Sequence, residues 1–467
     1  MGNFFHHKTY NCTVTSNPEP LPLRRIIRTW WPLAASWVLM GAELPALAAV
    51  VARLAEPEIN LAAYGGVVFP LSLIIESPII MLLAASTALS KDWASYRKLR
   101  RFMMVAGASL TALHVLVAFT PLYYFVVEKV IGAPQEIVEP ARIGLMIMTP
   151  WTWSIAFRRF NQGVLIRFDH SKAVGMGTMV RLSADVTVLI AGYLIGNIPG
   201  IIVATSAVAA GVVSEAIFAG IVVRPVLRNQ LKLAPPVKDP ITLRSFLDFY
   251  FPLVLTSLLT LIVQPIGSAA LSRMPLALSS LAVWPVVSGL IFMLRSMGVA
   301  FNEVVVALLD EPQSTKSLRR FSILLAAGTT VILLAITATP LSGIWFEQVS
   351  GLEPALASMA ILGMWIALPM PALSVYQSWY QGVILHGRRT KGITEAVVVF
   401  LVTCSALLWA GVAWGRITGL YVGLAAFVTA MLLQTVWLWF ASRSAESRVL
   451  ERDQFQASQH PSEAPAD

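Results

Sequence analysis

The chain has 467 residues, of which 57% are hydrophobic and 13% charged, and its formal net charge is +9. So much apolar surface exceeds what a soluble core needs, which excludes an ordinary soluble domain and predicts lipid as the solvent. The basic residues gather on one side of the predicted membrane. We therefore assign the positive charge to contacts with anionic lipids and expect no nucleic-acid partner.

An apolar helix needs about 20 residues to cross the hydrocarbon layer of a membrane. The first half of the chain contains six runs long enough to do so, within residues 26–52, 61–89, 102–127, 143–166, 174–196 and 200–223. The second half contains six more, within residues 246–272, 276–309, 321–346, 355–385, 393–415 and 418–440. The strand alternation typical of barrels is missing. The predicted fold class is an all-α integral membrane protein with about twelve transmembrane helices.

The second half repeats the first about 219 positions later. Leu99-Arg100-Arg101-Phe102 returns as Leu318-Arg319-Arg320-Phe321, and Gln162-Gly163-Val164 returns as Gln381-Gly382-Val383. An even number of spans in each repeat predicts two parallel six-helix halves, an arrangement typical of transporters.

The repeat also defines the predicted domains. These are an N-terminal arm (1–23), a first lobe (24–223, helices 1 to 6), a linker (224–244), a second lobe (245–442, helices 7 to 12) and a tail (443–467). We expect the arm and the tail to be disordered. About 26 Lys and Arg residues lie in the N-terminal flank, the tail and alternate loops, one of which we place at Arg158 to Lys172, and about five lie in the other loops. This asymmetry predicts that both termini are cytoplasmic in a multi-pass protein of the plasma membrane.

Six ionisable residues interrupt the apolar runs, namely Glu43, Glu76, Arg181, Asp185, Glu215 and Arg295. Each costs about 2.5 to 3.5 kcal/mol at the centre of a membrane helix, so most of them must face protein or water. Arg181 and Asp185 are four residues apart on one helical face, which predicts a structural or coupling ion pair. Glu215 and Gln434 occupy equivalent positions of the repeat, and we expect interhelical polar contacts there.

The predicted binding residues lie on helices 1, 2, 7 and 8 and are Glu43, Glu76, Gln264 and Arg295. The same helices carry Pro45, Pro70, Pro265 and Pro285, which predict breaks or hinges. Bent helices often line transport cavities, although kinks for packing and interhelical hydrogen bonds are the simpler alternatives. We therefore predict a cavity that touches at least two of the four binding residues. The acids would attract a coupling H⁺ or Na⁺, and Arg295 an anionic substrate.

Several short motifs carry a family resemblance. They are Trp30-Trp31-Pro32-Leu33, Phe249-Tyr250-Phe251-Pro252-Leu253, Ala282-Val283-Trp284-Pro285, and Pro369-Met370-Pro371 leading to Gln381-Gly382-Val383. Between residues 24 and about 442 the chain resembles the progressive ankylosis protein family. That family belongs to the multidrug/oligosaccharidyl-lipid/polysaccharide (MOP) exporter superfamily, which includes the multidrug and toxin extrusion (MATE) transporters. The resemblance implies an exporter that alternates between inward-open and outward-open states and moves small organic anions such as citrate, nucleotide or pyrophosphate.

Other functions remain open at this stage. A cation-coupled multidrug antiporter and a lipid-linked saccharide flippase would use the same scaffold. The major facilitator fold also has parallel halves, but the loop Ser90-Lys91-Asp92-Trp93 lacks its usual motif. No zinc-protease, Walker or Gly-x-Ser-x-Gly motif is present, so we expect no enzyme activity, no metal and no cofactor. A non-transporting scaffold is the least favoured alternative.

Overall fold

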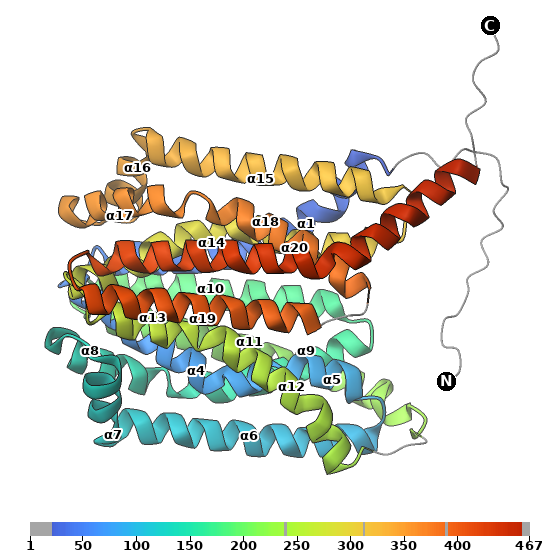
Figure 1. Cartoon of the computed structure of the whole chain (residues 1–467). Coiled ribbons are helices and arrows are strands. Elements are labelled where there is room, and N and C mark those ends of the chain that lie inside the picture. Colours follow the sequence, from blue (N-terminus) through green and yellow to red (C-terminus); the bar gives the residue numbers. More distant parts are fainter. Residues whose placement is uncertain (1–20, 238–240, 312, 388–390, 460–467) are drawn as a thin grey trace, which may run out of the picture.

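The structure is a computed structural model that describes residues 21–237, 241–311, 313–387 and 391–459. Within these ranges the chain folds almost entirely into helices that run roughly side by side (Figure 1). Eleven helical spans of the described residues are long and apolar enough to cross a membrane, judged by length and composition. The protein is therefore a multi-pass, all-α membrane protein.

The first half contains α1 (Leu23–Gly41), α2 (Glu43–Val51), α3 (Pro57–Ala63), the π-helical turn η1 (Tyr64–Val68), α4 (Phe69–Ile80), α5 (Leu82–Leu89), α6 (Trp93–Phe119), α7 (Leu122–Tyr124), the π-helical turn η2 (Phe125–Ile131), α8 (Gln135–Ile147), α9 (Thr149–Arg167), α10 (Ser171–Ile195) and α11 (Gly200–Asn229). A short 3₁₀ turn, η3 (Leu231–Leu233), follows α11 in the connection between the halves.

The second half contains α12 (Leu243–Leu261), α13 (Val263–Leu271), α14 (Ala277–Leu308), α15 (Ser314–Ala338), α16 (Leu341–Gly343), the π-helical turn η4 (Ile344–Val349), α17 (Pro354–Ala367), α18 (Met370–His386), α19 (Lys391–Trp414) and α20 (Gly419–Gln459). Apart from α14, which is continuous where the first half has α3, η1, α4 and α5, the order of elements repeats that of the first half.

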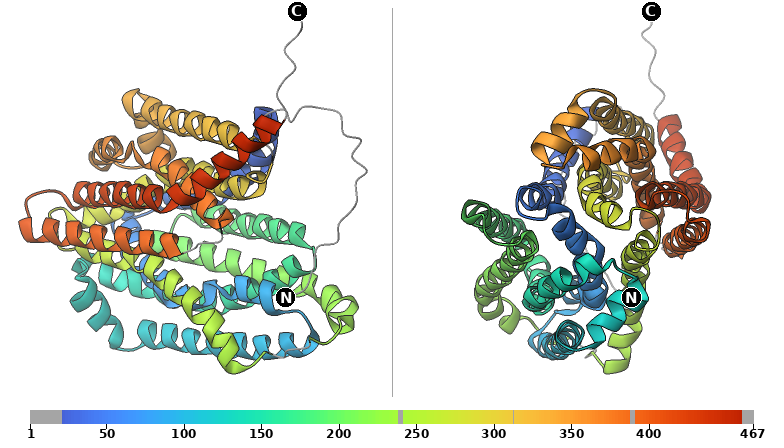
Figure 2. Two further views of the ribbon diagram at one scale, coloured as in Figure 1. Left: turned by 45° about the vertical axis from the view of Figure 1, so that its right-hand side comes forward. Right: turned by 90° about the vertical axis from the view of Figure 1, so that its left-hand side faces the viewer.

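The two halves point in the same direction. The long helices α6 and α15 both lead to a short helix at the same end of the molecule, α7 and α16, and this end lies on the left in Figure 1. Figure 2 shows the same bundle turned, in its right panel nearly along the helices. This arrangement confirms the predicted parallel six-helix repeats.

Proline causes the break in the first helix of each half. α1 ends at Gly41 and α12 ends at Leu261, four residues before Pro45 and Pro265. Proline has no N–H to donate to the carbonyl four residues earlier, so the helix changes direction there and restarts as α2 or α13. The predicted hinge positions at Pro45 and Pro265 therefore coincide with helix breaks.

Pro70 and Pro285 behave differently from each other. Pro70 follows η1 and has no N–H to donate to the Gly66 carbonyl four residues earlier. This carbonyl instead accepts a hydrogen bond from the hydroxyl of Ser268 in the other half. Pro285 lies inside α14, which continues without interruption from Ala277 to Leu308. Its ring packs against Gly65, where a Cβ atom would lie 2.7 Å from the Pro285 Cγ atom. Only glycine allows this approach of the two halves.

The predicted fourth transmembrane helix, 143–166, differs most from the structure. The structure divides it between α8 and α9, and α9 does not qualify as a span by apolarity because it carries Arg158, Arg159, Asn161 and Gln162. Most of these polar side chains are buried against other helices of the first half, so the segment is placed by protein contacts.

The tail prediction was wrong over most of its length. Residues 443–459 continue α20 as a helix, and the remainder of the tail, like most of the N-terminal arm, lies outside the described residues. The side chain of Arg452 donates to the Leu309 carbonyl at 2.7 Å, and Asp453 accepts from the Thr315 amide at 3.1 Å. These contacts, together with good helix formers such as Ala, Glu and Arg, extend the helix beyond the predicted bilayer. α11 likewise runs six residues into the predicted linker.

Candidate functional site

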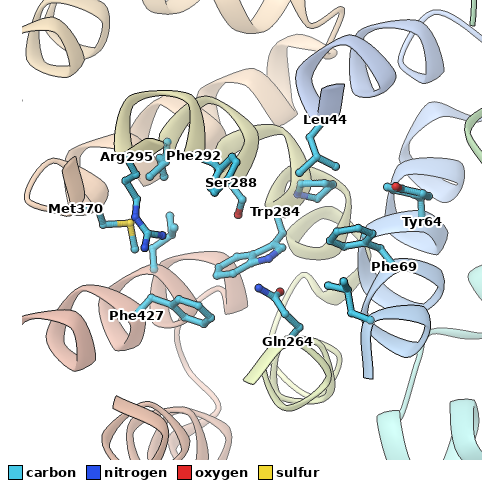
Figure 3. Close-up of a pocket in the computed structure, with 15 residues that line it drawn as sticks. Leu44, Tyr64, Phe69, Gln264, Trp284, Ser288, Phe292, Arg295, Met370 and Phe427 are labelled. Atoms are coloured by element: carbon cyan, nitrogen blue, oxygen red, sulfur yellow. The ribbon is translucent and has the colours of Figure 1, made fainter. Parts of the chain in front are cut away.

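A cavity of about 310 Å³ lies between the two halves. Its lining residues come from both of them and are Leu44, Tyr64, Gly65, Phe69, Leu73, Gln264, Trp284, Pro285, Ser288, Ile291, Phe292, Arg295, Met370, Leu424 and Phe427 (Figure 3). Of the four predicted binding residues, the structure places Gln264 and Arg295 at this cavity and Glu43 and Glu76 outside it. Most of the wall is apolar or aromatic, and Gln264, Ser288 and Arg295 contribute polar groups to it.

Arg295 provides the positive charge of the cavity. It projects from the middle of α14, and within the described residues no acid or hydrogen-bond acceptor pairs with its guanidinium group. A buried cation without a partner is costly in a membrane protein, and an anionic ligand would remove that cost. The guanidinium geometry also matches carboxylate and phosphate oxygens, which it can hold through two parallel hydrogen bonds.

A second, polar cavity of about 250 Å³ touches the other side of Arg295. Its walls come from α14 and α18 and consist of Arg295, Val299, Asn302, Glu303, Ser374, Gln377, Ser378 and Gln381. Both helices run from this cavity toward the end of the molecule where the basic loops lie. Arg295 thus stands between the central cavity and a polar space nearer the basic end.

Glu43 and Asp185 pair with an arginine instead of lining the cavity. One guanidinium nitrogen of Arg181 donates to both carboxylate oxygens of Glu43, at 2.5 and 2.6 Å, and joins α10 to the start of α2. The Nε atom of Arg181 lies 3.8 Å from Asp185. The predicted Arg181–Asp185 pair is therefore present, but the shorter contact is to Glu43. Within the described ranges neither Asp185 oxygen has a hydrogen-bond donor, although the residue is only 2% exposed.

Glu76 and Glu215 belong to the same buried region. Glu215 accepts from the guanidinium of Arg158 and, at 2.8 Å, from the amide of Gln162. Glu76 is buried, and one of its oxygens has no hydrogen-bond partner among the described residues. The predicted position of Arg158 in a basic loop was wrong, because Arg158 lies within α9 and is only 6% exposed.

The second half has neutral groups in place of the Arg158–Glu215 ion pair. Shifted by 219 positions, Arg158 and Glu215 become Gln377 and Gln434, and the amide of Gln377 donates to the Gln434 side-chain oxygen at 3.1 Å. Gln434 is therefore an interhelical contact, as is Glu215. The same shift takes Asp185 to Cys404. Among the described residues, the three interior ion pairs Arg158–Glu215, Arg181–Glu43 and Arg181–Asp185 thus all lie in the first half of a duplicated scaffold.

Arginines also connect the halves at the end away from the basic loops. Arg53 donates to the Gln348 carbonyl at the end of η4, and Arg273 donates to the Lys129, Val130 and Ile131 carbonyls at the end of η2. Helix ends expose carbonyls that have no partner within the helix, so a cation is favoured at this position.

Sequence reasoning missed several residues of the site. Trp284, Ser288 and Phe427 line the cavity, as does the buried Tyr64. Aromatic residues are common in membrane helices, and only their position at the cavity distinguishes Tyr64, Trp284 and Phe427.

Comparison with protein families matches residues 14–287, more than half of the chain, to the progressive ankylosis protein (ANKH). The chain belongs to the progressive ankylosis protein family. The family assignment from short motifs is therefore confirmed.

Solved structures show which fold this family member has. An inward-facing structure of a multidrug resistance MATE family transporter of the MOP superfamily matches with a TM-score of 0.70 at 13% identity, over 91% of this chain and 99% of that chain. A MOP superfamily transporter from Pyrococcus furiosus, described by the reverse polarity of its binding pocket, gives 0.58 at 17% identity, over 92% and 96%. The lipid II flippase MurJ gives 0.60 at 13% identity, over 92% and 93%. The chain has the MOP-superfamily fold.

Proposed function

We propose that this protein is an alternating-access secondary transporter that exports a small organic anion through the cavity between its halves. The observation that carries the proposal is the unpaired guanidinium of Arg295 at that cavity. Carboxylate or phosphate groups of the substrate would complete its coordination, with Gln264 and Ser288 as further hydrogen-bonding groups.

The size of the cavity supports a small substrate. Ligand pockets for drug-sized molecules range from about 300 to 1,000 Å³, and the central cavity lies at the lower end of that range with about 310 Å³. Anions of the size of citrate or pyrophosphate fit this volume better than a nucleotide does. We take the polar cavity beside Arg295 as the start of a path toward the basic end, and we place that end on the cytoplasmic side of the plasma membrane because Lys and Arg gather there.

We further propose that the first half couples transport to protons. Asp185 and Glu76 are buried and have carboxylate oxygens without donors, which makes each a candidate proton acceptor. Arg181 already occupies the space beside Glu43 and Asp185, where a Na⁺ ion would need several oxygen ligands. These contacts favour H⁺ over Na⁺ as the coupling ion.

The test uses purified protein in proteoliposomes. Radiolabelled citrate, pyrophosphate and ATP are offered under a pH gradient, a Na⁺ gradient or neither, and organic cations are offered in the same way. We expect saturable transport of at least one of the small anions that depends on the pH gradient. Transport of cations alone would favour the multidrug antiporter, movement of lipid-linked saccharides the flippase, and no transport of any of these would favour a scaffold.

A further inference from the structure

We infer that the first half carries a binding site for one anionic phospholipid at its basic end. The site is a cavity of about 610 Å³ between α6, α9 and α11, distinct from the cavities that touch Arg295. Much of its wall is aromatic or aliphatic and includes Phe157, Phe160 and Ile221. Two arginines, Arg100 and Arg224, also line it.

The two arginines are available to a ligand. Both are exposed, and within the described part of the chain neither side chain takes part in a hydrogen bond, an ion pair or a ring contact. Among the residues that the structure describes, no Asp or Glu lines the cavity. A third cation, Lys232, lies 5.0 Å from the centre of the Trp93 ring, which forms part of the same wall. An excess of cations with no acid to neutralise them favours a phosphate group.

The remaining walls favour a lipid over a free phosphate. Ile217 and Ile221 line the cavity, and their side chains are 58% and 56% exposed on a helix long and apolar enough to span the membrane. The cavity is therefore bounded on that side by residues that face the bilayer. An acyl chain would cover the apolar wall, while Arg100 and Arg224 hold the headgroup at the end of the span.

The repeat supplies an internal comparison. The equivalent cavity of the second half, which includes Arg319, Tyr376, Trp379 and Trp439, has a volume of only about 170 Å³. Gly220 of the first half corresponds to Trp439, whose ring occupies this position in the second half. Arg224 corresponds to Arg443, which stacks 3.9 Å from the Trp439 ring centre. In the second half Trp439 thus fills the cavity and stacks with Arg443. In the first half the cavity is open, and among the described residues Arg224 has no such contact.

The experiment measures lipid retained by the purified full chain. Protein in detergent is titrated with dioleoylphosphatidylglycerol or dioleoylphosphatidylcholine, and bound lipid is counted by native mass spectrometry. We expect one phosphatidylglycerol to bind at least tenfold more tightly than phosphatidylcholine. The double variant R100Q/R224Q should lose this preference, while the matched double variant R319Q/R443Q in the second half should keep it. Inorganic phosphate at the same concentration should not displace the lipid.

The inference is overturned by equal binding of the two lipids, by a preference that R100Q/R224Q keeps or that both double variants lose equally, or by displacement of the lipid by inorganic phosphate alone, which would indicate a simple anion site. Gly220→Trp provides a second variant that fills the cavity as the second half does and leaves both arginines in place. It should also lower phosphatidylglycerol retention at least tenfold. Thermal unfolding of each variant identifies any that fail to fold, and unchanged retention in folded Gly220→Trp would place the lipid elsewhere.

Discussion

Arg53 and Arg273 occupy equivalent positions of the two halves, and each donates hydrogen bonds to backbone carbonyls of the opposite half. The carbonyls that they reach are equivalent too, because Lys129 and Gln348 differ by 219 positions. The two contacts therefore form a reciprocal pair of latches at the end away from the basic loops. In an alternating-access cycle both latches must open before that end can open.

Removing the latches should shift the protein toward the state that is open at this end. Hydrogen bonds to charged groups contribute about 1.5 to 3 kcal/mol each, so R53A/R273A should raise the open population by about tenfold or more. The measurement is the rate at which an impermeant thiol reagent, added on the Arg53 side, modifies a cysteine at position 264 in a cysteine-free background. Arg416→Ala, a change at an exposed residue of the same end, is the control. An unchanged rate in the double variant would argue against latches.

Arg295 should be essential for anion transport. Arg295→Ala removes the only charge that lines the central cavity among the described residues, and we expect uptake of the transported anion to fall at least tenfold. Arg295→Lys keeps the charge without the two-pronged geometry and should retain part of the activity. Initial rates at several anion concentrations separate binding from turnover. If Arg295→Ala transports at the parent rate while folding normally, the anion binds elsewhere.

The acids of the first half should control coupling. Asp185→Asn removes a buried carboxylate that lacks hydrogen-bond donors, so anion exchange without a pH gradient should persist while stimulation by the gradient disappears. Cys404→Ser alters the equivalent position of the second half and serves as the control. The comparison is of transport rates with and without the gradient. Full stimulation in Asp185→Asn would exclude this residue as the coupling group.

The buried Arg158–Glu215 pair permits a test that uses the protein's own second half as a guide. Arg158→Gln or Glu215→Gln alone leaves a buried charge unpaired, which costs about 3 to 5 kcal/mol. R158Q/E215Q creates the amide pair found at Gln377 and Gln434, so its loss of stability should be much smaller than the sum of the single losses. Thermal unfolding in one detergent measures all three variants. Additive losses would show that the pair does not act as a unit.

Gly65→Ala should impair movement of the halves past each other. The added methyl group would lie 2.7 Å from the Pro285 ring, and overpacking of this kind costs about 1 to 3 kcal/mol. We expect a transport rate at least several-fold lower with substrate binding largely retained. Gly328→Ala, where the added Cβ atom meets nothing within 4 Å, is the matched control. Equal transport rates in the two variants would show that the contact between Gly65 and Pro285 tolerates a larger residue.

The sequence predicted the scaffold better than the site. Span length, the repeat and the basic loops were enough for a parallel, duplicated bundle, because each follows from the cost of placing polar groups in lipid. The pairing of Glu43 with Arg181 could not be predicted, since 138 residues separate the two and only packing brings them together. Arg158 was placed in a loop because a polar helix at the edge of an apolar run has the composition of a loop. Only its buried ion-pair partner, Glu215, shows that Arg158 belongs to the interior.

The contacts between glycine and proline have a mechanical consequence. Pro285 rests on Gly65, and Pro45 lies 3.0 Å from the position a Cβ atom of Gly289 would take, so at the central cavity the backbones of the halves nearly touch. Two rigid bodies in contact at such points rotate about them, so that one end of the molecule closes as the other opens. A pair of spin labels spanning the lobes at the Arg53 end and a second pair at the basic end should therefore report separations that change in opposite directions in every step of the cycle.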